Sequence, residues 1–479
     1  MSGPAYTQDP LPAAPAQPEK KPSQLGSYGM IALALSLGYF AFTAKTTNVL
    51  HTYLGLLILT GATLPSLLWA RRADYRFPVF EVFMLTGVNT YAIPLLTGHS
   101  QLAQYTDDTI TTAGLAVLFF QVVANIVYAL TTGSPKRSQA WTQEVISHHI
   151  TDYLAYGMAV TTVYTVLSEF TELIPRELNS VLRAACFGIG IICTFIQARM
   201  WGEGTLPQRS KGIFVFQLFL QVFFSWAALF LIGGLSILVL ALLGYTSGGR
   251  KIPVLAIALV LPIIGVLHNG KSVMRDKYWE GGAPRPTITE LPSFFHEWIG
   301  HGLEPPTEGT TLRESPKVLD RTSLFHIFCL VVSLTPDPLP YLNGETYGFV
   351  PGQFVPSVFW DAKPPAHIAT NTLSVYYGLQ VMEATAKTTI AFGLLTEAYA
   401  NFGFIGMGLI AVFFAFCFKK FGCWSARSPM LSYPGLVQIV LMAWSFQAEL
   451  TFAAWSGSLY QACIAVLGIP FLIRKFLGE

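Results

Sequence analysis

Residues 212–245 read GIFVFQLFLQVFFSWAALFLIGGLSILVLALLGY and contain no charged side chain. Inside a bilayer the backbone must satisfy its own hydrogen bonds, so a stretch of this kind crosses the membrane as helix. One crossing of the hydrocarbon core takes about 20 residues. The stretch is therefore either one long tilted helix or two short helices that turn at Gly233–Gly234. This choice decides on which side of the membrane every later segment lies.

The distribution of Lys and Arg favours two helices. A single helix would place Arg250 and Lys251 outside, whereas two helices keep every basic cluster and both termini in the cytoplasm, as the excess of Lys and Arg in cytoplasmic loops requires. The intervening short loops contain only Lys45 and Arg176. The basic clusters lie in alternate short loops, at Lys20/Lys21, Arg71/Arg72/Arg76, Lys136/Arg137, Arg199/Arg209/Lys211, Arg250/Lys251, Lys419/Lys420/Arg427 and Arg474/Lys475.

The composition of the whole chain agrees with a membrane protein. Of the 479 residues, 52% are apolar and 12% are charged, and the mean hydropathy is +0.49. We predict an all-α polytopic membrane protein of about twelve transmembrane helices. Besides the two helices of the quoted stretch, the expected spans are residues 25–44, 47–70, 78–98, 109–132, 150–169, 179–198, 252–267, 390–418, 434–448 and 458–473.

The spans divide the chain into four parts. Residues 1–24 are rich in Pro, Ala, Gln and Ser and are predicted to form a disordered cytoplasmic tail. Residues 25–269 form an N-terminal bundle of about nine helices, whose first span acts as an uncleaved anchor. Residues 270–389 form one long extracytoplasmic loop. Residues 390–479 supply about three more helices.

Several kinds of site are disfavoured. The net charge of +2 implies no nucleic-acid partner, and the six cysteines include no CxxC pair and are expected to pack within helices. His296 and His301 are five residues apart and do not share the helix face that a zinc-binding HExxH motif needs. Asp107–Asp108 is expected to be a solvated turn. We predict neither a metal ion nor another cofactor.

The long loop at residues 270–389 is not needed to cross the membrane and therefore calls for another explanation. It is dense in aromatic, histidine and charged residues, so we expect it to fold as a cap on the outer face. Within it, Ser323–Leu334 is apolar but too short to span. This segment is predicted to be an interfacial or re-entrant helix that ends at the proline-rich TPDPLP sequence.

The first cluster of candidate residues begins the loop. Lys271 and Arg275 are four residues apart, which places them on one face of a helix that leaves the membrane. Two cations at this depth suit a lipid-linked diphosphate, and Lys277 extends the cluster. Tyr278 and Trp279 follow. The alternative is a belt of interfacial basic and aromatic residues without a ligand.

The second cluster spans residues 341–367, YLNGETYGFVPGQFVPSVFWDAKPPAH. It contains Glu345, Asp361, Lys363 and His367 among prolines that stiffen the backbone. A carboxylate, a histidine and a lysine together can perform acid–base chemistry on a hydroxyl group. The alternative is a polar surface turn.

The third cluster, residues 388–408, reads TTIAFGLLTEAYANFGFIGMG. Glu397 and Asn401 are four residues apart at the outer end of a span, where a carboxylate is costly unless it faces protein or water. A functional Glu397 is therefore expected. Tyr399 and the glycines nearby are equally consistent with helix packing.

These clusters, in this order, resemble the Wzy-type O-antigen and exopolysaccharide repeat-unit polymerases. The matching pieces are Lys271/Arg275, the element VPSVFWDAKP at residues 355–364, and EAYANFGFIG at residues 397–406. The match covers about the last 210 residues of the chain. Many such polymerases have Arg where this chain has Ser357, so that cation would have to come from Lys363, Arg313 or Arg321.

The resemblance implies a GT-C-like glycosyltransferase of the bacterial inner membrane. Such an enzyme joins undecaprenyl-diphosphate-linked oligosaccharides at the periplasmic face, and a chain-length regulator is an expected partner. Lys271, Arg275 and Lys363 would neutralise the leaving diphosphate, and Glu397, Asp361 and His367 are the candidate bases. The expected substrate-binding residues are Lys363, Arg313, Arg321, Lys277, Tyr347, Trp360, Tyr399, Asn401 and Glu345. Trp279 and Trp298 are further candidates for stacking on sugars.

Two other functions remain open. A polysaccharide ligase would share the fold and the donor but use a different acceptor. A flippase or another transporter belongs to a different class, in which inverted repeats and broken helices with buried charge are typical. No repeat is visible in the sequence, and the predicted spans show no charged path.

Overall fold

The computed structural model describes residues 25–46, 48–71, 77–133, 150–171, 173–280, 282–284, 286–304, 323–355, 359–360, 362–386, 389–426 and 428–476. Within these ranges the secondary structure is helical and no strand occurs. Eight helices are long and apolar enough to cross a membrane. The predicted class, an all-helical polytopic membrane protein, is confirmed at this level.

The eight candidate spans are Gly26–Thr43, Val49–Arg71, Val79–Thr97, Asp107–Leu130, Ala185–Glu203, Gln208–Ala227, Val254–Tyr278 and Gly393–Ser425. Two further helices, α7 (Ile150–Phe170) and α10 (Leu231–Ser247), are not among these candidate spans. The other elements up to the long loop are α1 (Leu25–Thr43), α2 (Val49–Arg71), α3 with η1 and α4 (Val79–Gly87, Val88–Ala92 and Ile93–Thr97), α5 (Asp107–Leu130), α8 (Arg176–Glu203), α9 (Gln208–Ala227) and α11 (Val254–Arg275). A short 3-10 helix, η2 (Ser100–Gln104), precedes α5.

The decisive stretch, residues 212–245, forms two helices as predicted, but the turn lies at Ala228–Phe230 rather than at Gly233–Gly234. Leu229 has a positive φ of 59°, and its N–H donates to the carbonyl of Trp226 at 2.7 Å. Both glycines belong to the first turn of α10. A Cβ on Gly234 would lie 2.3 Å from the indole nitrogen of Trp226, so this glycine permits close helix packing rather than a turn.

Contacts between loops support the alternating arrangement. Arg250 donates to the carbonyl of Gly202 at 3.3 Å, which joins two loops predicted on the cytoplasmic side. Lys420 likewise donates to the carbonyl of Thr132 at 2.9 Å. At the other end of the bundle, the N–H of Lys45 donates to the carbonyl of Leu96 at 2.9 Å. Loops that the sequence places on one side therefore meet at one end of the helices.

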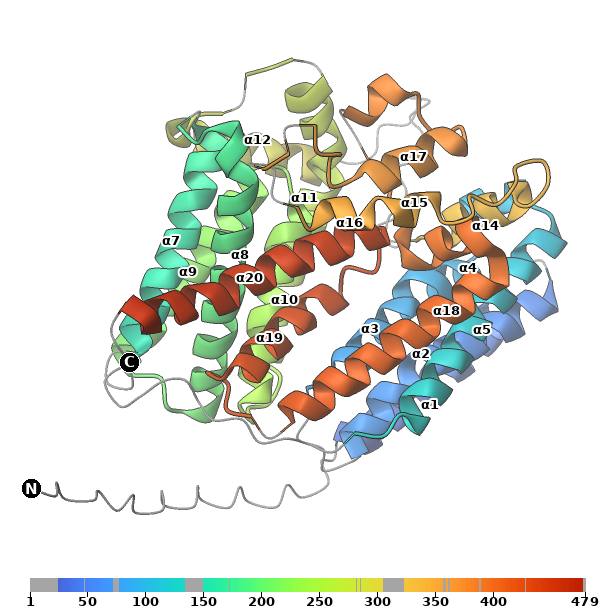
Figure 1. Cartoon of the computed structure of the whole chain (residues 1–479), viewed down its shortest axis with the longest axis horizontal. Helices are drawn as coiled ribbons and strands as arrows, with labels where there is room; N and C mark the ends of the chain where they lie inside the picture. Colours follow the sequence, from blue (N-terminus) through green and yellow to red (C-terminus); the bar gives the residue numbers. More distant parts are fainter. Residues whose placement is uncertain are drawn as a thin grey trace, which may run out of the picture.

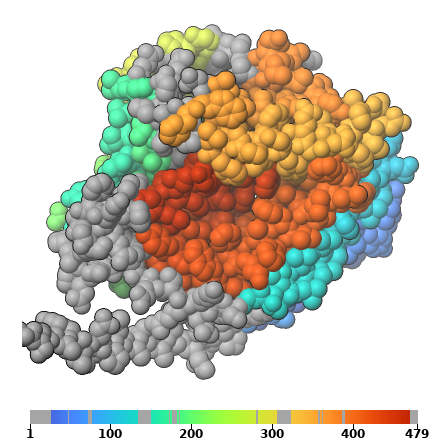
Figure 2. Space-filling view, viewed as in Figure 1, coloured from blue at the N-terminus to red at the C-terminus, as the bar shows by residue number. Residues whose placement is uncertain are grey.

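The described part of the long loop is also helical. It comprises η3 (Asp276–Glu280), η4 (Ile288–Glu290), α12 (Leu291–Leu303), α14 (Phe325–Leu334), α15 (Glu345–Gly348), α16 (Val350–Gln353), α17 (Ile368–Tyr376) and η6 (Met382–Ala386). Three helices follow it: α18 (Gly393–Ser425), α19 (Tyr433–Ser445) and α20 (Phe452–Phe476). Figure 2 shows the loop segments after residue 323 lying across α18 and α20. The apolar helix α14 packs against α5 and α18 and buries Phe325, Phe328 and Val331.

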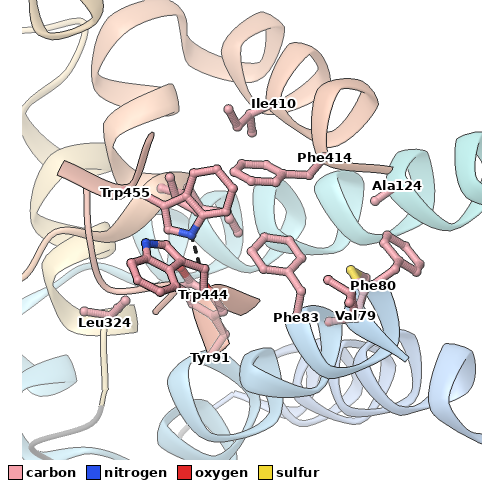
Figure 3. Packing of buried hydrophobic residues seen from close by; sticks show 14 of the residues in the cluster. Val79, Phe80, Phe83, Tyr91, Ala124, Leu324, Ile410, Phe414, Trp444 and Trp455 are labelled. Carbon is pink, nitrogen blue, oxygen red and sulfur yellow. Dashed lines mark hydrogen bonds between the residues drawn. The ribbon is translucent and has the colours of Figure 1, made fainter. Parts of the chain in front are cut away.

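The buried apolar residues form two separate clusters. In the larger one the indole N–H of Trp455 donates to the carbonyl of Trp444 at 3.1 Å, and Phe414 packs against Trp455 with 5.0 Å between ring centroids (Figure 3). The smaller cluster surrounds Trp298 and Leu267, on α12 and α11. The start of the long loop and its end therefore belong to different cores, and Figure 1 shows α12 and α18 well apart.

Candidate functional site

The helix α18 is broken at Gly403, where φ is 58° and ψ is −138°. Only glycine adopts this conformation readily. The break removes helical partners from nearby carbonyl groups, and a buried carbonyl must find another donor. The N–H groups of Leu342 and Asn343 supply it, donating to the carbonyls of Ala400 and Asn401 at 3.1 Å each. A turn of the long loop thus completes the hydrogen bonding of a membrane helix.

The side chain of Asn401 fixes that turn in place. It is fully buried, and its oxygen accepts the N–H of Gly344 at 3.0 Å. Its nitrogen donates to the hydroxyl of Thr346 at 2.8 Å and to the carbonyl of Glu397, one helical turn earlier, at 2.8 Å. Asn401 therefore joins the second and third sequence clusters into one network. Thr346, which sequence reasoning overlooked, is part of it.

Glu397 connects this network to the last helix. Its side chain is 0% exposed, and Oε2 accepts the N–H of Phe452, the first residue of α20, at 2.5 Å. The first N–H groups of a helix lack intrahelical partners, and the positive end of the helix dipole favours a carboxylate there. The other oxygen, Oε1, has no hydrogen-bond partner among the described residues. In this conformation Glu397 contacts protein rather than solvent, so its visible role is to position α20.

Tyrosines surround the same junction. The ring of Tyr347 packs edge-on against Phe452 with 5.9 Å between centroids, and burial together with the Glu397 carboxylate raises the pKa of Tyr347. Tyr399 is buried, and its ring packs edge-on against Phe328. Both therefore support the junction from within. Glu345, by contrast, is exposed beside it.

The rest of the second cluster lies at the surface. Lys363 donates to the carbonyls of Gln353 and Val355, at 3.2 and 2.7 Å, and so satisfies carbonyl groups at the end of α16. Partial burial lowers the pKa of Lys363. Trp360 is 39% exposed and covers Gly352. Asp361, Ser357, Arg313, Arg321 and the side chain of Trp279 lie outside the described residues.

The pKa of His367 depends on the charge of a residue that sequence reasoning missed. His367 precedes the first turn of α17, and partial burial together with the positive charge of Arg183 lowers its pKa below the ordinary value of 6.5. Arg183 is an exposed residue of α8, just before the Ala185–Glu203 span. The signal was present in the sequence, because Arg183 falls inside the expected span 179–198 and an arginine there must face protein or water.

The first cluster forms a separate unit. Arg275 donates to the carbonyl of Leu229, in the turn between α9 and α10, at 3.1 Å. Lys277 forms an ion pair with Glu297 of α12 at 2.6 Å. Trp298 is 0% exposed and donates to the carbonyl of Leu267 at 2.7 Å, so the expectation that it stacks on a sugar is not met. Lys271 is half-buried on α11.

The structure therefore does not bring the two ends of the loop into one site. Lys271 and Arg275 lie beside the small core of α11 and α12, whereas Glu397 lies in the larger core. The reason is local, because the loop begins by folding back on α11. The two helices α11 and α12 pack so closely that a Cβ on Gly302 would lie 2.1 Å from the carbonyl oxygen of Val266. The positive charge of Arg183, on α8, is one cause of the lowered pKa of His367 in the loop.

A second acidic residue also escaped notice. Glu449 lies between α19 and α20, and burial raises its pKa. The backbone beside it is close to the start of α18, because Leu394 donates its N–H to the carbonyl of Ala448 at 3.2 Å. No motif marks this residue in the sequence. It is a further carboxyl group at the α18–α20 junction.

Together, these elements define a polytopic α-helical membrane protein with a folded extramembrane loop that is joined to α18 and α20. No protein-family model, curated protein sequence or solved structure matches this chain. Among the described residues, no group of three or more His, Cys, Asp and Glu side chains could hold a metal ion.

Proposed function

We propose that the protein is a polysaccharide polymerase that joins polyprenyl-diphosphate-linked oligosaccharides at the periplasmic face of a bacterial inner membrane. The observation that carries this proposal is the position of His367 at the start of α17, with a pKa that partial burial and the positive charge of Arg183 on α8 both lower. A cation on a membrane helix suits a lipid diphosphate, and a histidine with a lowered pKa is neutral near pH 7 and able to accept a proton.

The topology of this proposal has about twelve spans, both termini in the cytoplasm and a GT-C-like arrangement. Four of the helices that it needs, α7, α10, α19 and α20, are not among the eight that are both long and apolar enough to cross a membrane. Its support is the positive-inside pattern, together with the loop contacts of Arg250 and Lys420 at one end of the bundle.

The proposed reaction transfers the growing chain to a new repeat unit. A hydroxyl oxygen of the acceptor sugar attacks the anomeric carbon of the donor, and the bond from that carbon to the diphosphate oxygen breaks. The hydroxyl proton passes to the imidazole of His367. The departing diphosphate keeps the bonding electrons, and Arg183 stabilises its developing charge.

The other residues have supporting roles in this proposal. Donor and acceptor each carry a lipid diphosphate, and Lys271 and Arg275 provide a second cationic position for one of them. Trp360 is exposed enough to stack on a sugar ring. Glu397 and Asn401 hold the loop turn and α20 in place.

The test is a reconstitution of the purified protein with lipid-linked repeat units, with chain length read by electrophoresis. We expect Arg183→Ala and His367→Ala to leave single units, whereas Arg209→Ala, at the opposite end of the bundle, forms polymer. In cells, deletion of the gene should leave single-repeat surface polymer while lipid-linked units accumulate outside. Polymer of normal length from both variants would refute the assignment.

One observation favours a second candidate, a transporter of lipid-linked oligosaccharides. The broken helix α18 carries a fully buried carboxylate, which is a common feature of transporters. In that case the deletion would leave lipid-linked units in the cytoplasmic leaflet. A ligase, the third possibility, would differ by transferring finished polymer to a non-polymer acceptor in the reconstituted assay.

A further inference from the structure

A groove of about 590 Å³ lies on the surface of α8 and α9. Figure 1 labels these two helices. Trp201 of α8 forms one wall. The other wall is a single face of α9, because its members are spaced three and four residues apart. They are Gln208, Lys211, Gly212, Val215, Phe216 and Phe219.

The groove is polar at one end and apolar along the rest. Lys211 and Gln208 lie in the first turn of α9, joined by a hydrogen bond of 3.3 Å, and phenylalanines and a valine follow. From Gln208 to Phe219 the helix rises by about 16 Å. This length matches half of a hydrocarbon core of about 30 Å. The groove thus has the polarity and length of one lipid molecule in one leaflet.

The charge around the polar end is positive. Arg209 and Lys211 lie on α9, and Arg250 reaches the same end, where it donates to the carbonyl of Gly202 beside Trp201. Of the two basic residues of α9, Lys211 is half-buried within the groove, whereas Arg209 is exposed and does not line it. A lysine held beside an aromatic wall is suited to a single phosphate group.

We propose that this groove binds an anionic phospholipid, with its phosphate at Lys211 and Gln208 and one acyl chain along Val215, Phe216 and Phe219. The site lies at the end of the bundle opposite Arg183 and His367. It is therefore independent of the proposed polymerase chemistry. The groove can be blocked by a larger side chain at Gly212. A Cβ on Gly212 meets nothing within 4 Å, so the new side chain would enter the groove without a clash.

The experiment uses the full chain in vesicles and measures quenching of Trp201 by brominated lipids. The chain contains 10 tryptophans, so the signal of Trp201 is isolated by subtracting the quenching of a Trp201→Phe variant. Brominated phosphatidylglycerol is compared with brominated phosphatidylcholine at equal mole fractions. We expect half-maximal quenching at a mole fraction about fivefold lower for phosphatidylglycerol.

The variants separate a site from general surface charge. Lys211→Gln and Gly212→Leu should each remove the preference. Arg209→Gln, which removes the same charge outside the groove, and Gly265→Leu, which fills open space on α11, should both retain it. Equal quenching by the two lipids, or the same loss in Arg209→Gln, overturns the proposal. Unlabelled lipids can also be added to compete with brominated phosphatidylglycerol. If a polyprenyl phosphate reduces the quenching of Trp201 more than unlabelled phosphatidylglycerol does, the choice of lipid is overturned.

Discussion

The carboxylate of Glu397 accepts the backbone N–H of Phe452 at 2.5 Å, across 55 residues of sequence. This bond joins the second turn of α18 to the first residue of α20. Glu397 could act by positioning α20 or by accepting a proton. A substitution by glutamine separates these two roles, because glutamine can accept the same hydrogen bond but cannot accept a proton at neutral pH.

We expect Glu397→Gln to fold normally and to form polymer. Glu397→Ala should lose about 1–2 kcal/mol of stability, because the N–H of Phe452 is then buried without an acceptor. Thermal unfolding in detergent gives the stability, and the reconstituted assay gives the chain length. If Glu397→Gln is as stable as the unmodified protein but makes no polymer, Glu397 has a chemical role beyond positioning α20.

The break in α18 predicts a position that tolerates only glycine. Gly403→Ala should destabilise the protein by at least about 1–3 kcal/mol, because φ is positive and a Cβ would lie 2.7 Å from the hydroxyl of Tyr341. Gly408→Ala is the matched control, since a Cβ there lies at an ordinary 3.5 Å from Phe119. The melting temperature of each variant is the measurement. Equal melting temperatures would mean that α18 is straight in solution.

The interaction of Arg183 with His367 predicts a shift in pH dependence. If neutral His367 is the base, the rate falls as the pH drops through its pKa. Removing the like charge in Arg183→Gln should raise that pKa toward 6.5, so the fall occurs at higher pH. A pH profile of the residual rate tests this expectation. Arg209→Gln serves as the control and should leave the profile unchanged.

The docking of α12 on α11 should depend on pH. Lys277 lowers the pKa of Glu297 below its ordinary 4.5, so the ionised carboxylate contributes stability at neutral pH that is lost as the pH falls through the lowered value. Lys277→Gln should shrink this pH-dependent contribution, because the pKa of Glu297 then lies closer to its ordinary value. Hydrogen exchange in α12, corrected for the intrinsic rate at each pH, measures it. An unchanged profile in the variant would assign the docking to Trp298 and its neighbours alone.

The sequence predicted the helical class because the spans are blocks of apolar residues and the basic clusters fall in alternate loops between them. It placed the turn of residues 212–245 incorrectly, since the role of Gly234 depends on Trp226 in the preceding helix. Asn401 and Thr346 form a hydrogen bond although they are 55 residues apart in the sequence. No helical or strand periodicity predicts a contact between residues so far apart. Arg183 could have been found, because a charge within an expected span is a visible signal.

The joining of the loop to α18 and α20 has a consequence for the order in which the protein is made. The turn at residues 342–346 is synthesised before the carbonyls and the amide side chain that it binds on α18. Glu397 in turn precedes the N–H of Phe452. The junction of the loop with α18 and α20 therefore cannot reach its final form while the ribosome is still translating the segments before α20. A chain that stops before the last helix would keep the loop turn on α18 but would leave Glu397 without the N–H of Phe452.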